Sequence, residues 1–399
     1  MEIREHRKSR ANAEIRSGSR ADFSNIHLLF RLLPVRRNKP VVGLQQHAYS
    51  LLQDRSFLMS RQDMDCFITF LTKNYSTYGP LQKNRQTVFG QINNPGDILW
   101  EYEQTILSPK KYLHQPMETL FSFKDGGSVL NDVRDGQKQV LFGLHPCDIH
   151  GIHILDRVFS GKYADPYYLE RRQNTILVAL GCMNAYETCW CTSFGTGPNL
   201  TEGFDIMVSP LGQTFLVEVG SERGEKLLEQ YGGPEKADPS LLAEYARLKA
   251  AKLETIENQI IKRTSTDGMG QLLEVSVNHP VWNKLDDECL ACGSCTIVCP
   301  TCFCFNVIDK VDLTLRSGER QRVWDSCMLL EFAEVALGVN FRNERAARIK
   351  QRIYHKLYSF PYQYDVMGCV GCGRCTRFCI KKIDPREIIS EMRDARDEV

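Results

Sequence analysis

Sixteen cysteines stand in a chain of 399 residues, and eight of them form two copies of one spaced array. Each copy has the spacing C-x2-C-x2-C-x3-C, made by Cys289, Cys292, Cys295 and Cys299 and again by Cys369, Cys372, Cys375 and Cys379. Three thiolates in one short loop can bind three irons of a cubane, while the fourth cysteine tends to ligate the cluster of the other array. We therefore expect two [4Fe–4S] clusters, one on Cys289, Cys292, Cys295 and Cys379 and one on Cys369, Cys372, Cys375 and Cys299.

Other uses of these eight cysteines fit the pattern less well. Disulfides require an oxidising compartment, and no signal peptide is visible at the start of the chain. Zinc prefers two separated C-x2-C pairs to a continuous run of four cysteines. The second array lacks the proline that follows the first at Pro300, which removes only a helix-start signal. A zinc-stabilised scaffold protein stays as the alternative.

Four further cysteines follow two buried strands that the apolar runs 139–144 and 175–180 predict. They are Cys147, Cys182, Cys189 and Cys191. If the two strands are adjacent and parallel, the loops at their carboxyl ends meet. Four thiols suffice for a third cluster, although zinc or buried free cysteines would also explain them.

A last group, Cys302, Cys304 and Cys327, is one thiol short of a cubane. These thiols either pack around the first cluster and tune its potential by weak S–H hydrogen bonds, which we favour, or bind a further cluster with an outside ligand. Cys66 stands alone and is expected in the core.

No other motif indicates catalysis. His145, His150 and His153 are expected to be satisfied surface or capping groups rather than metal ligands. The chain has neither G-x-G-x-x-G nor a Walker loop, which argues against a Rossmann pocket for NAD(P) or FAD. No side chain is a convincing acid, base or nucleophile, so we expect no catalytic residue.

Composition limits the partners. Lysine and arginine number 50 against 49 aspartates and glutamates, a balance that argues against nucleic-acid binding. No apolar run approaches the roughly 18 residues of a membrane span. Hydrophobic residues make up 42% of the chain, as in a soluble globular protein. Many cysteines without a secretory signal indicate a reducing, cytoplasmic location.

The pattern along the chain predicts an α+β protein in three parts. Residues 1–58 are expected to be a disordered basic extension, a basic arm for membrane or nucleic acid, or sequence upstream of a start at Met59. Residues 59–275 predict a mixed α/β domain, with helices near 65–71 and from Asp238 onward. Residues 276–399 predict an α-helical ferredoxin-like domain, with one helix across 329–337 and a last one after Asp384.

Several stretches together resemble a known family. They are 110–112, 115–116, 120–121, 142–149, 182–191, 289–304, 324–327, 340–342 and 369–379. They are similar to the β subunit of sulfhydrogenase, a soluble NAD(P)-linked [NiFe] hydrogenase, and to an iron–sulfur subunit of anaerobic sulfite reductase. The resemblance covers about residues 60–390. Residues 142–149 and 324–327 look nearer to sulfhydrogenase.

This resemblance implies a non-catalytic electron-transfer subunit of an anaerobic, hetero-oligomeric oxidoreductase complex. The partners implied are a flavin-binding NAD(P)H-oxidoreductase subunit together with a terminal catalytic subunit, which is either a [NiFe] hydrogenase or a sirohaem sulfite reductase. The family has cysteines at positions 147, 182, 189 and 191, which strengthens the expectation of a third cluster. A reductase acting by itself on sulfur compounds through its exposed thiols is the alternative. Arg374, inside the second array, is expected to favour the reduced state of the adjacent cluster.

Overall fold

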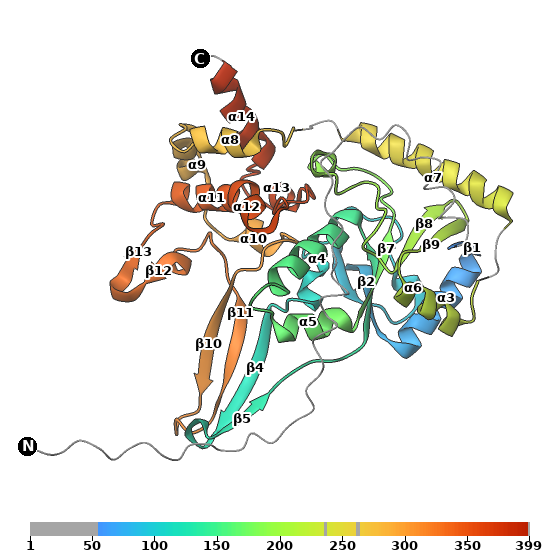
Figure 1. Ribbon diagram of the computed structural model, residues 1–399, viewed down its shortest axis with the longest axis horizontal. Helices are drawn as coiled ribbons and strands as arrows, with labels where there is room; N and C mark the ends of the chain where they lie inside the picture. Colours follow the sequence, from blue (N-terminus) through green and yellow to red (C-terminus); the bar gives the residue numbers. More distant parts are fainter. Residues whose placement is uncertain (1–54, 235–237, 261–263, 398–399) are drawn as a thin grey trace, which may run out of the picture. The chain divides into compact units, whose positions relative to one another are not determined.

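The computed structural model describes residues 55–234, 238–260 and 264–397 (Figure 1). Most of the predicted basic extension lies outside these residues. Its last residues, however, belong to strand β1 (Ser56–Ser60), which pairs with β9 (Thr214–Val219). The folded region therefore begins before Met59. None of the helices in the described ranges is long and apolar enough to cross a membrane.

A seven-stranded mixed sheet forms the first half of the fold, in the order β1-β9-β8-β7-β6-β2-β3. The remaining strands are β2 (Ser76–Lys83), β3 (Gln86–Gln91), β6 (Gln139–Leu144), β7 (Thr175–Leu180) and β8 (Ile206–Leu211). β6 and β7 are buried at every position, as expected for strands covered on both faces. They pair in parallel, which confirms the predicted neighbours and brings the loops that follow them to one edge.

Helices cover both faces of this sheet (Figure 1). They are α3 (Arg61–Asn74), α4 (Pro146–Phe159), α5 (Pro166–Gln173), α6 (Glu222–Tyr231) and α7 (Pro239–Gln259). Phe142 of β6 packs with α3 and α6 on one side, whereas Leu141 packs with α4 and α5 on the other. A bulge at Gly143, whose φ is +80°, ends the regular pairing of β6 just before α4. The strand thereby delivers its carboxyl end to the start of α4.

Cys66 is exposed, so its predicted place in the core is wrong. The buried stripe of α3 consists of Met64, Phe67, Ile68 and Leu71. This is the spacing of one helix face, and position 66 falls outside it.

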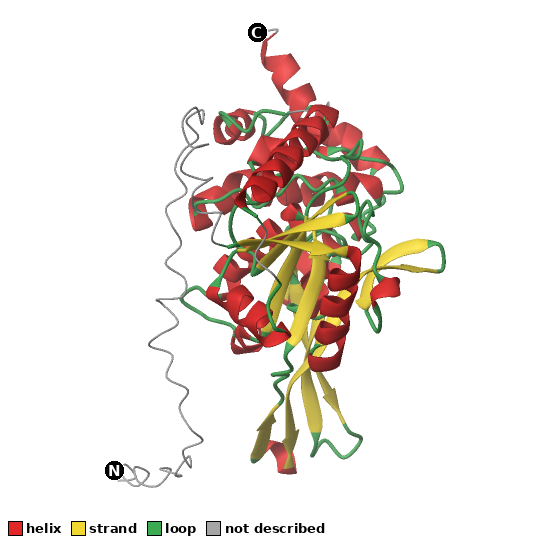
Figure 2. Ribbon diagram, turned by 90° about the vertical axis from the view of Figure 1, so that its right-hand side faces the viewer, coloured by secondary structure: helices red, strands yellow, loops and turns green. Residues whose placement is uncertain are grey.

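The second half of the fold gathers the remaining helices, together with further strands (Figure 2). The helices are α8 (Met269–Val275), α9 (Val281–Glu288), α10 (Ser294–Ile297), α11 (Arg345–Tyr354), α12 (Phe360–Tyr364), α13 (Arg374–Arg377) and α14 (Pro385–Asp397). A π-helical turn, η8 (His355–Ser359), joins α11 to α12. Trp282, Ile353 and Ile389 belong to the apolar core that binds these helices together.

The second half is not purely helical, which corrects the sequence expectation. β10 (Phe305–Val311) and β11 (Gly318–Trp324) form a four-stranded antiparallel sheet with β4 (Met117–Lys124) and β5 (Val129–Asp132). This sheet joins segments from both halves of the sequence.

The helix expected across 329–337 is also absent. That stretch holds two single turns and β12 (Glu334–Val335), which pairs with β13 (Val339–Asn340). Leu337 has a φ of +67° and is fully exposed. The apolar spacing resembles that of a helix, but the side chains of Leu329, Leu330, Val335 and Leu337 are all exposed.

Candidate iron–sulfur centres

The two cysteine arrays adopt the same local structure. In each array a glycine with positive φ, Gly293 (+75°) or Gly373 (+74°), begins a short helix, α10 or α13. The third cysteine lies on the first turn of that helix, and the fourth follows its end. Glycine is favoured at both positions because this backbone conformation is costly for other residues. The repeat in sequence is therefore a repeat in structure.

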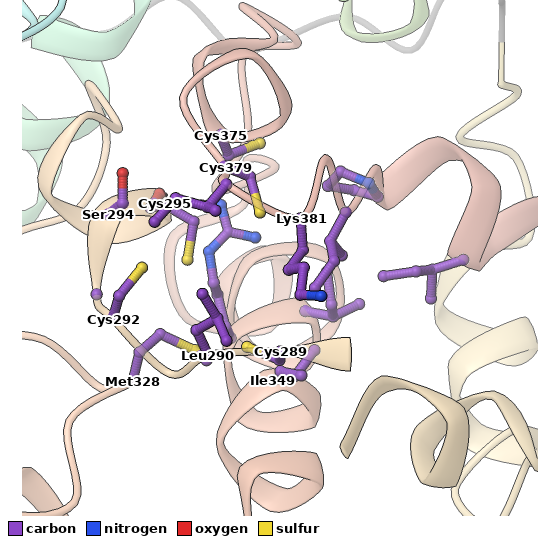
Figure 3. Close-up of a pocket in the computed structure, with 17 residues that line it drawn as sticks. Cys289, Leu290, Cys292, Ser294, Cys295, Met328, Ile349, Cys375, Cys379 and Lys381 are labelled. Carbon is purple, nitrogen blue, oxygen red and sulfur yellow. Dashed lines mark hydrogen bonds between the residues drawn. The ribbon is translucent and has the colours of Figure 1, made fainter. Parts of the chain in front are cut away.

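One cavity lies between the two arrays and is lined mainly by apolar side chains (Figure 3). Its walls include Cys289, Cys292, Cys295 and Cys379, the four thiols expected to share the first cluster. Cys292 is exposed, so this cavity reaches the protein surface.

A second cavity is lined by Cys299, Cys369, Cys372 and Cys375, the four thiols expected to share the second cluster. Trp190, Val370 and Leu357 close it with apolar surface. Cys299 and Cys372 are buried. In both cavities the structure thus brings three thiols of one array together with the fourth thiol of the other, and Cys375 lines both cavities. Among the described residues no three His, Cys, Asp or Glu side chains are grouped to hold a single metal ion.

Two buried cations that the sequence does not predict, Arg352 and Lys356, line the second cavity, and Arg352 lines the first as well. Arg352 of α11 is 7% exposed, as is Lys356, one helical turn later. Arg352 donates to the carbonyl of Cys295 at 3.2 Å, and its Nε has no hydrogen-bond partner. Lys356 donates to Thr301 Oγ1 at 2.6 Å and to the carbonyl of Gly368 at 3.0 Å.

The charge of these cations is balanced by sulfur rather than by carboxylates. Burial lowers the pKa of Lys356, but the neighbouring Cys299 and Cys302 raise it above the ordinary value overall. Neither Lys356 nor Arg352 pairs with a carboxylate among the described residues. Two buried positive charges beside eight thiols fit an anionic thiolate-bound cofactor, which would neutralise them.

The raised pKa values of the buried thiols also favour a bound metal. Burial raises the pKa of Cys369 to about 12 and that of Cys295 to about 11. A thiolate in such an apolar wall is unfavourable by itself, and a coordinated metal stabilises the deprotonated form. The donor set and its surroundings therefore fit [4Fe–4S] clusters.

The four upstream cysteines also come close together. Cys147 stands at the start of α4, Cys182 follows β7, and Cys189 and Cys191 lie in the next loop. Burial raises the pKa of Cys182, and the nearby thiols of Cys191 and Cys189 raise it further. Burial raises the pKa of Cys147 as well, and the nearby thiols of Cys372, in the second array, and of Cys182 raise this pKa further. This quartet therefore neighbours the second cavity.

Two glycines allow the second array to pack closely against the loop that carries Cys189 and Cys191. The backbone N–H of Trp190 donates to the carbonyl of Gly371 at 2.9 Å. A Cβ at Gly371 would lie 2.6 Å from the backbone nitrogen of Cys191, and one at Gly373 would lie 2.2 Å from the carbonyl oxygen of Thr188. Only glycine permits so close an approach.

A buried ion pair crosses the same junction. Arg374, 0% exposed, makes a bidentate contact with Asp148, 1% exposed, at 2.7 and 3.1 Å. The sequence predicts that the positive charge of Arg374 favours the reduced state of the adjacent cluster. Since Asp148 neutralises much of that charge, we expect Arg374 to shift the potential of the adjacent cluster less than unpaired Arg352 does.

Breaking this pair should destabilise the fold. Arg374→Met leaves the Asp148 carboxylate buried without a partner, and we expect it to cost about 3–5 kcal/mol of the free energy of unfolding. Anaerobic chemical denaturation of the cluster-loaded chain measures the effect. The matched control is Arg320→Met, which breaks an exposed pair with Asp309 and should cost about 1 kcal/mol or less. Equal losses in the two variants would contradict this role of the buried pair.

The histidines do not form a metal site with these thiols. His145 is buried and stacks on Tyr102 with ring centroids 4.1 Å apart. His153 bonds to the carbonyl of Gly203 at 2.9 Å through Nε2. Burial lowers the pKa of His145 and of His150 to about 4 in each case. None of the three lines the two cavities.

Comparison with known proteins agrees with this geometry. Residues 288–383 match the family described as a 4Fe-4S dicluster domain. The chain is 36% identical over 323 residues to sulfhydrogenase 2 subunit beta of Pyrococcus furiosus, an alignment covering 79% of this chain and 92% of that protein. No solved structure matches. Fold and thiol geometry thus define an iron–sulfur protein with a [4Fe–4S] dicluster domain. It belongs to the sulfhydrogenase beta-subunit family.

Proposed function

We propose that this chain is the electron-transfer subunit of a cytoplasmic hydrogenase complex of the sulfhydrogenase type. It would carry electrons between a flavin-binding NAD(P)H-oxidoreductase subunit and a terminal [NiFe] catalytic subunit. The observation that carries the proposal is the pair of cavities, each of which includes three thiols of one array and the fourth thiol of the other, with Cys375 in the lining of both. The chain's own relationship to a hydrogenase beta subunit favours hydrogenase over sulfite reductase.

The first cluster is assigned to Cys289, Cys292, Cys295 and Cys379, and the second to Cys369, Cys372, Cys375 and Cys299. A third is assigned to Cys147, Cys182, Cys189 and Cys191. When bound, such clusters supply one-electron carriers. The protein holds them by its thiolates, and apolar side chains such as Trp190 and Ile353 exclude water around the second centre.

The surface near the first centre suits a partner protein. Leu290 and Ile380 line the first cavity and are 51% and 71% exposed, and the Cys292 thiol is exposed beside them. Apolar side chains around an exposed redox centre favour close approach of a second protein. We propose the first centre as the point of electron exchange with a partner, and the second as an internal station.

Metal analysis of anaerobically purified protein tests these assignments. We expect about twelve irons and about twelve acid-labile sulfides per chain from the three proposed centres, or about eight if only the two arrays bind clusters. Zinc in place of iron would contradict the electron-transfer proposal. Copurification of a flavoprotein and a [NiFe] protein from the native source would support it.

The third centre has its own test. Cys182→Ala should remove about four irons per chain, because Cys182 is the thiol that neighbours the other three. Cys66→Ala is the matched control, since that thiol is exposed on α3 and lines neither of the two cavities. An iron content unchanged in Cys182→Ala would show that the quartet holds no cluster.

A further inference from the structure

The two proposed dicluster centres differ in the positive charge that surrounds them. Arg352 lines both cavities, whereas Lys356 lines only the second of the two. Beside the first centre, Lys381 lines the cavity but is exposed, and Arg345 is half-buried near Cys289. Solvent and salt screen such partly exposed charges, but they screen buried charges much less. The second centre therefore has the stronger positive environment.

Lys356 is fixed between the two arrays at the second centre. Its ammonium group donates to Oγ1 of Thr301, which follows Cys299 by two residues. It also donates to the carbonyl of Gly368, the residue directly before Cys369. The backbone N–H of Gly368 in turn donates to the carbonyl of Lys356 at 2.8 Å. Lys356 thus joins the two chain segments that supply Cys299 and Cys369 to one centre.

Thr301 connects this ammonium group to a ligand sulfur. The Thr301 side chain is buried, and its Oγ1 lies 3.3 Å from Sγ of Cys299. The same hydroxyl donates to the carbonyl of Gly368 at 2.7 Å. Nearby charge and hydrogen bonds around the sulfur atoms set the potential of an iron–sulfur cluster. A positive charge held one hydroxyl group away from a ligand sulfur therefore stabilises the more negative, reduced state.

A second buried lysine reaches the same centre from the first half of the fold. Lys110 belongs to the single turn η3 (Pro109–Tyr112) and is 3% exposed. Its ammonium group donates to the carbonyl of Cys302 at 2.7 Å and lies 4.3 Å from the centre of the Trp324 ring. Burial lowers the pKa of Lys110, but the neighbouring thiols of Cys302 and Cys299 oppose this shift. An anionic cluster on Cys299 would favour the charged form of Lys110 in the same way.

Carboxylates do not cancel this charge in the part of the chain that the structure describes. Neither Lys110 nor Lys356 forms an ion pair with one there, and both donate to uncharged oxygen atoms. The lining of the two cavities contains no aspartate or glutamate. The positive charge of the two lysines therefore acts mainly on the second centre.

We propose that Lys356, assisted by Lys110, makes the second centre the more easily reduced of the two dicluster centres. The inference rests on the proposed electron-transfer function and adds the direction of its internal step. One electron leaves the first centre, which is oxidised, and reduces the second, with no bond formed or broken. An electron received at the surface of the protein is thereby stored at a buried site.

Redox titration of the anaerobically purified full chain, followed by EPR spectroscopy, tests this inference. In Lys356→Met, we expect the distribution of one electron between the two centres to shift by about tenfold or more towards the first, which corresponds to about 59 mV. Lys356→Arg keeps the charge and should restore most of the unaltered distribution, which separates charge from packing. Lys381→Met is the matched control, because this exposed lysine lines the first cavity and should change the distribution little.

Removing one centre assigns the shifted potential. Cys292 lines only the first of the two cavities, so Cys292→Ala should leave the second centre to be titrated without the first. Lys356→Met in this background should still lower the potential of the second centre. If Lys356→Met loses iron, Lys110→Met takes its place, because Lys110 does not join the two arrays and its loss should lower the same potential.

Two outcomes overturn the inference. One is a first centre that is reduced at a higher potential than the second in the unaltered protein. The other is a potential of the second centre that stays unchanged in both lysine variants. The proposed function fails separately, because it requires bound iron and its loss in Cys372→Ala, whichever centre is reduced first.

Discussion

Paired cysteine replacements are expected to lose iron in a crossed pattern. Cys379→Ala and Cys289→Ala belong to one cavity, so the double variant should lose about four irons per chain, no more than either single variant. Cys379→Ala combined with Cys369→Ala should lose about eight, although both cysteines stand in the same array. The physical reason is that α10 and α13 direct each fourth cysteine towards the other array.

Iron determination on the four variants measures this pattern, with acid-labile sulfide as a second readout. The corresponding double variant at the second cavity combines Cys299→Ala with Cys372→Ala, because both cysteines line that cavity. If Cys379→Ala and Cys369→Ala together removed only one cluster, each array would bind its own cubane. That result would overturn the crossed assignment, while leaving two clusters in the chain.

Replacing Arg352 by glutamine should lower the midpoint potentials of both dicluster centres. Arg352 lines both cavities, is buried, and has no carboxylate partner among the described residues. A unit charge about 6 Å from a cluster, at an effective dielectric constant of ~20, contributes about 3 kcal/mol, or on the order of 100 mV for one electron. The positive charge stabilises the more negative reduced state, so its removal makes reduction harder.

Spectroscopic redox titration of the cluster-loaded chain checks the effect of Arg352. Arg352→Lys keeps the charge and should restore most of the potential, which separates electrostatics from packing. Arg320→Gln is the surface control, because Arg320 is exposed in a hairpin and its charge is screened by solvent and salt. Potentials unchanged in Arg352→Gln at both centres would contradict the proposed role of this cation.

The grouping of the array thiols around two cavities was predictable because their geometry is local. The spacing within each array fixes three thiols in one loop, and the crossed fourth ligand follows from the helix that begins there. The meeting of Cys147 and Cys182 was predictable too, because buried apolar runs indicate parallel strands and parallel strands end at one edge. Each of these two predictions depends only on residues that are close in the sequence or on strands that are adjacent in one sheet.

The positions of Arg352 and Lys356 beside the cavities were not predictable in this way. Their helix carries Arg348, Arg352 and Lys356 at four-residue spacing, a pattern that usually marks a solvated face. Here that face packs against two cysteine arrays, so the cations are buried among sulfur atoms. The helix also carries Ile349 and Ile353, which are buried and directly follow Arg348 and Arg352 in the sequence. These two apolar residues were the sequence feature that could have indicated that the basic face is not exposed to solvent.

The four-stranded sheet also escaped prediction. β4 and β11 are far apart in the sequence, and no local pattern specifies such a pairing. This sheet matters for the site, because β10 and β11 place Cys304 beside Cys327. Tertiary contacts, rather than spacing, therefore bring Cys304 and Cys327 together.

Hydrogen evolution by the purified complex, driven either by NAD(P)H or by a reduced dye, tests electron relay through this chain most directly. In a complex carrying Cys372→Ala, we expect NAD(P)H still to reduce the flavin and a reduced dye still to drive hydrogen evolution. Hydrogen evolution driven by NAD(P)H should be lost, because the variant lacks a thiol of the internal second centre. NAD(P)H-driven hydrogen evolution that persists at the unaltered rate would contradict relay through this chain.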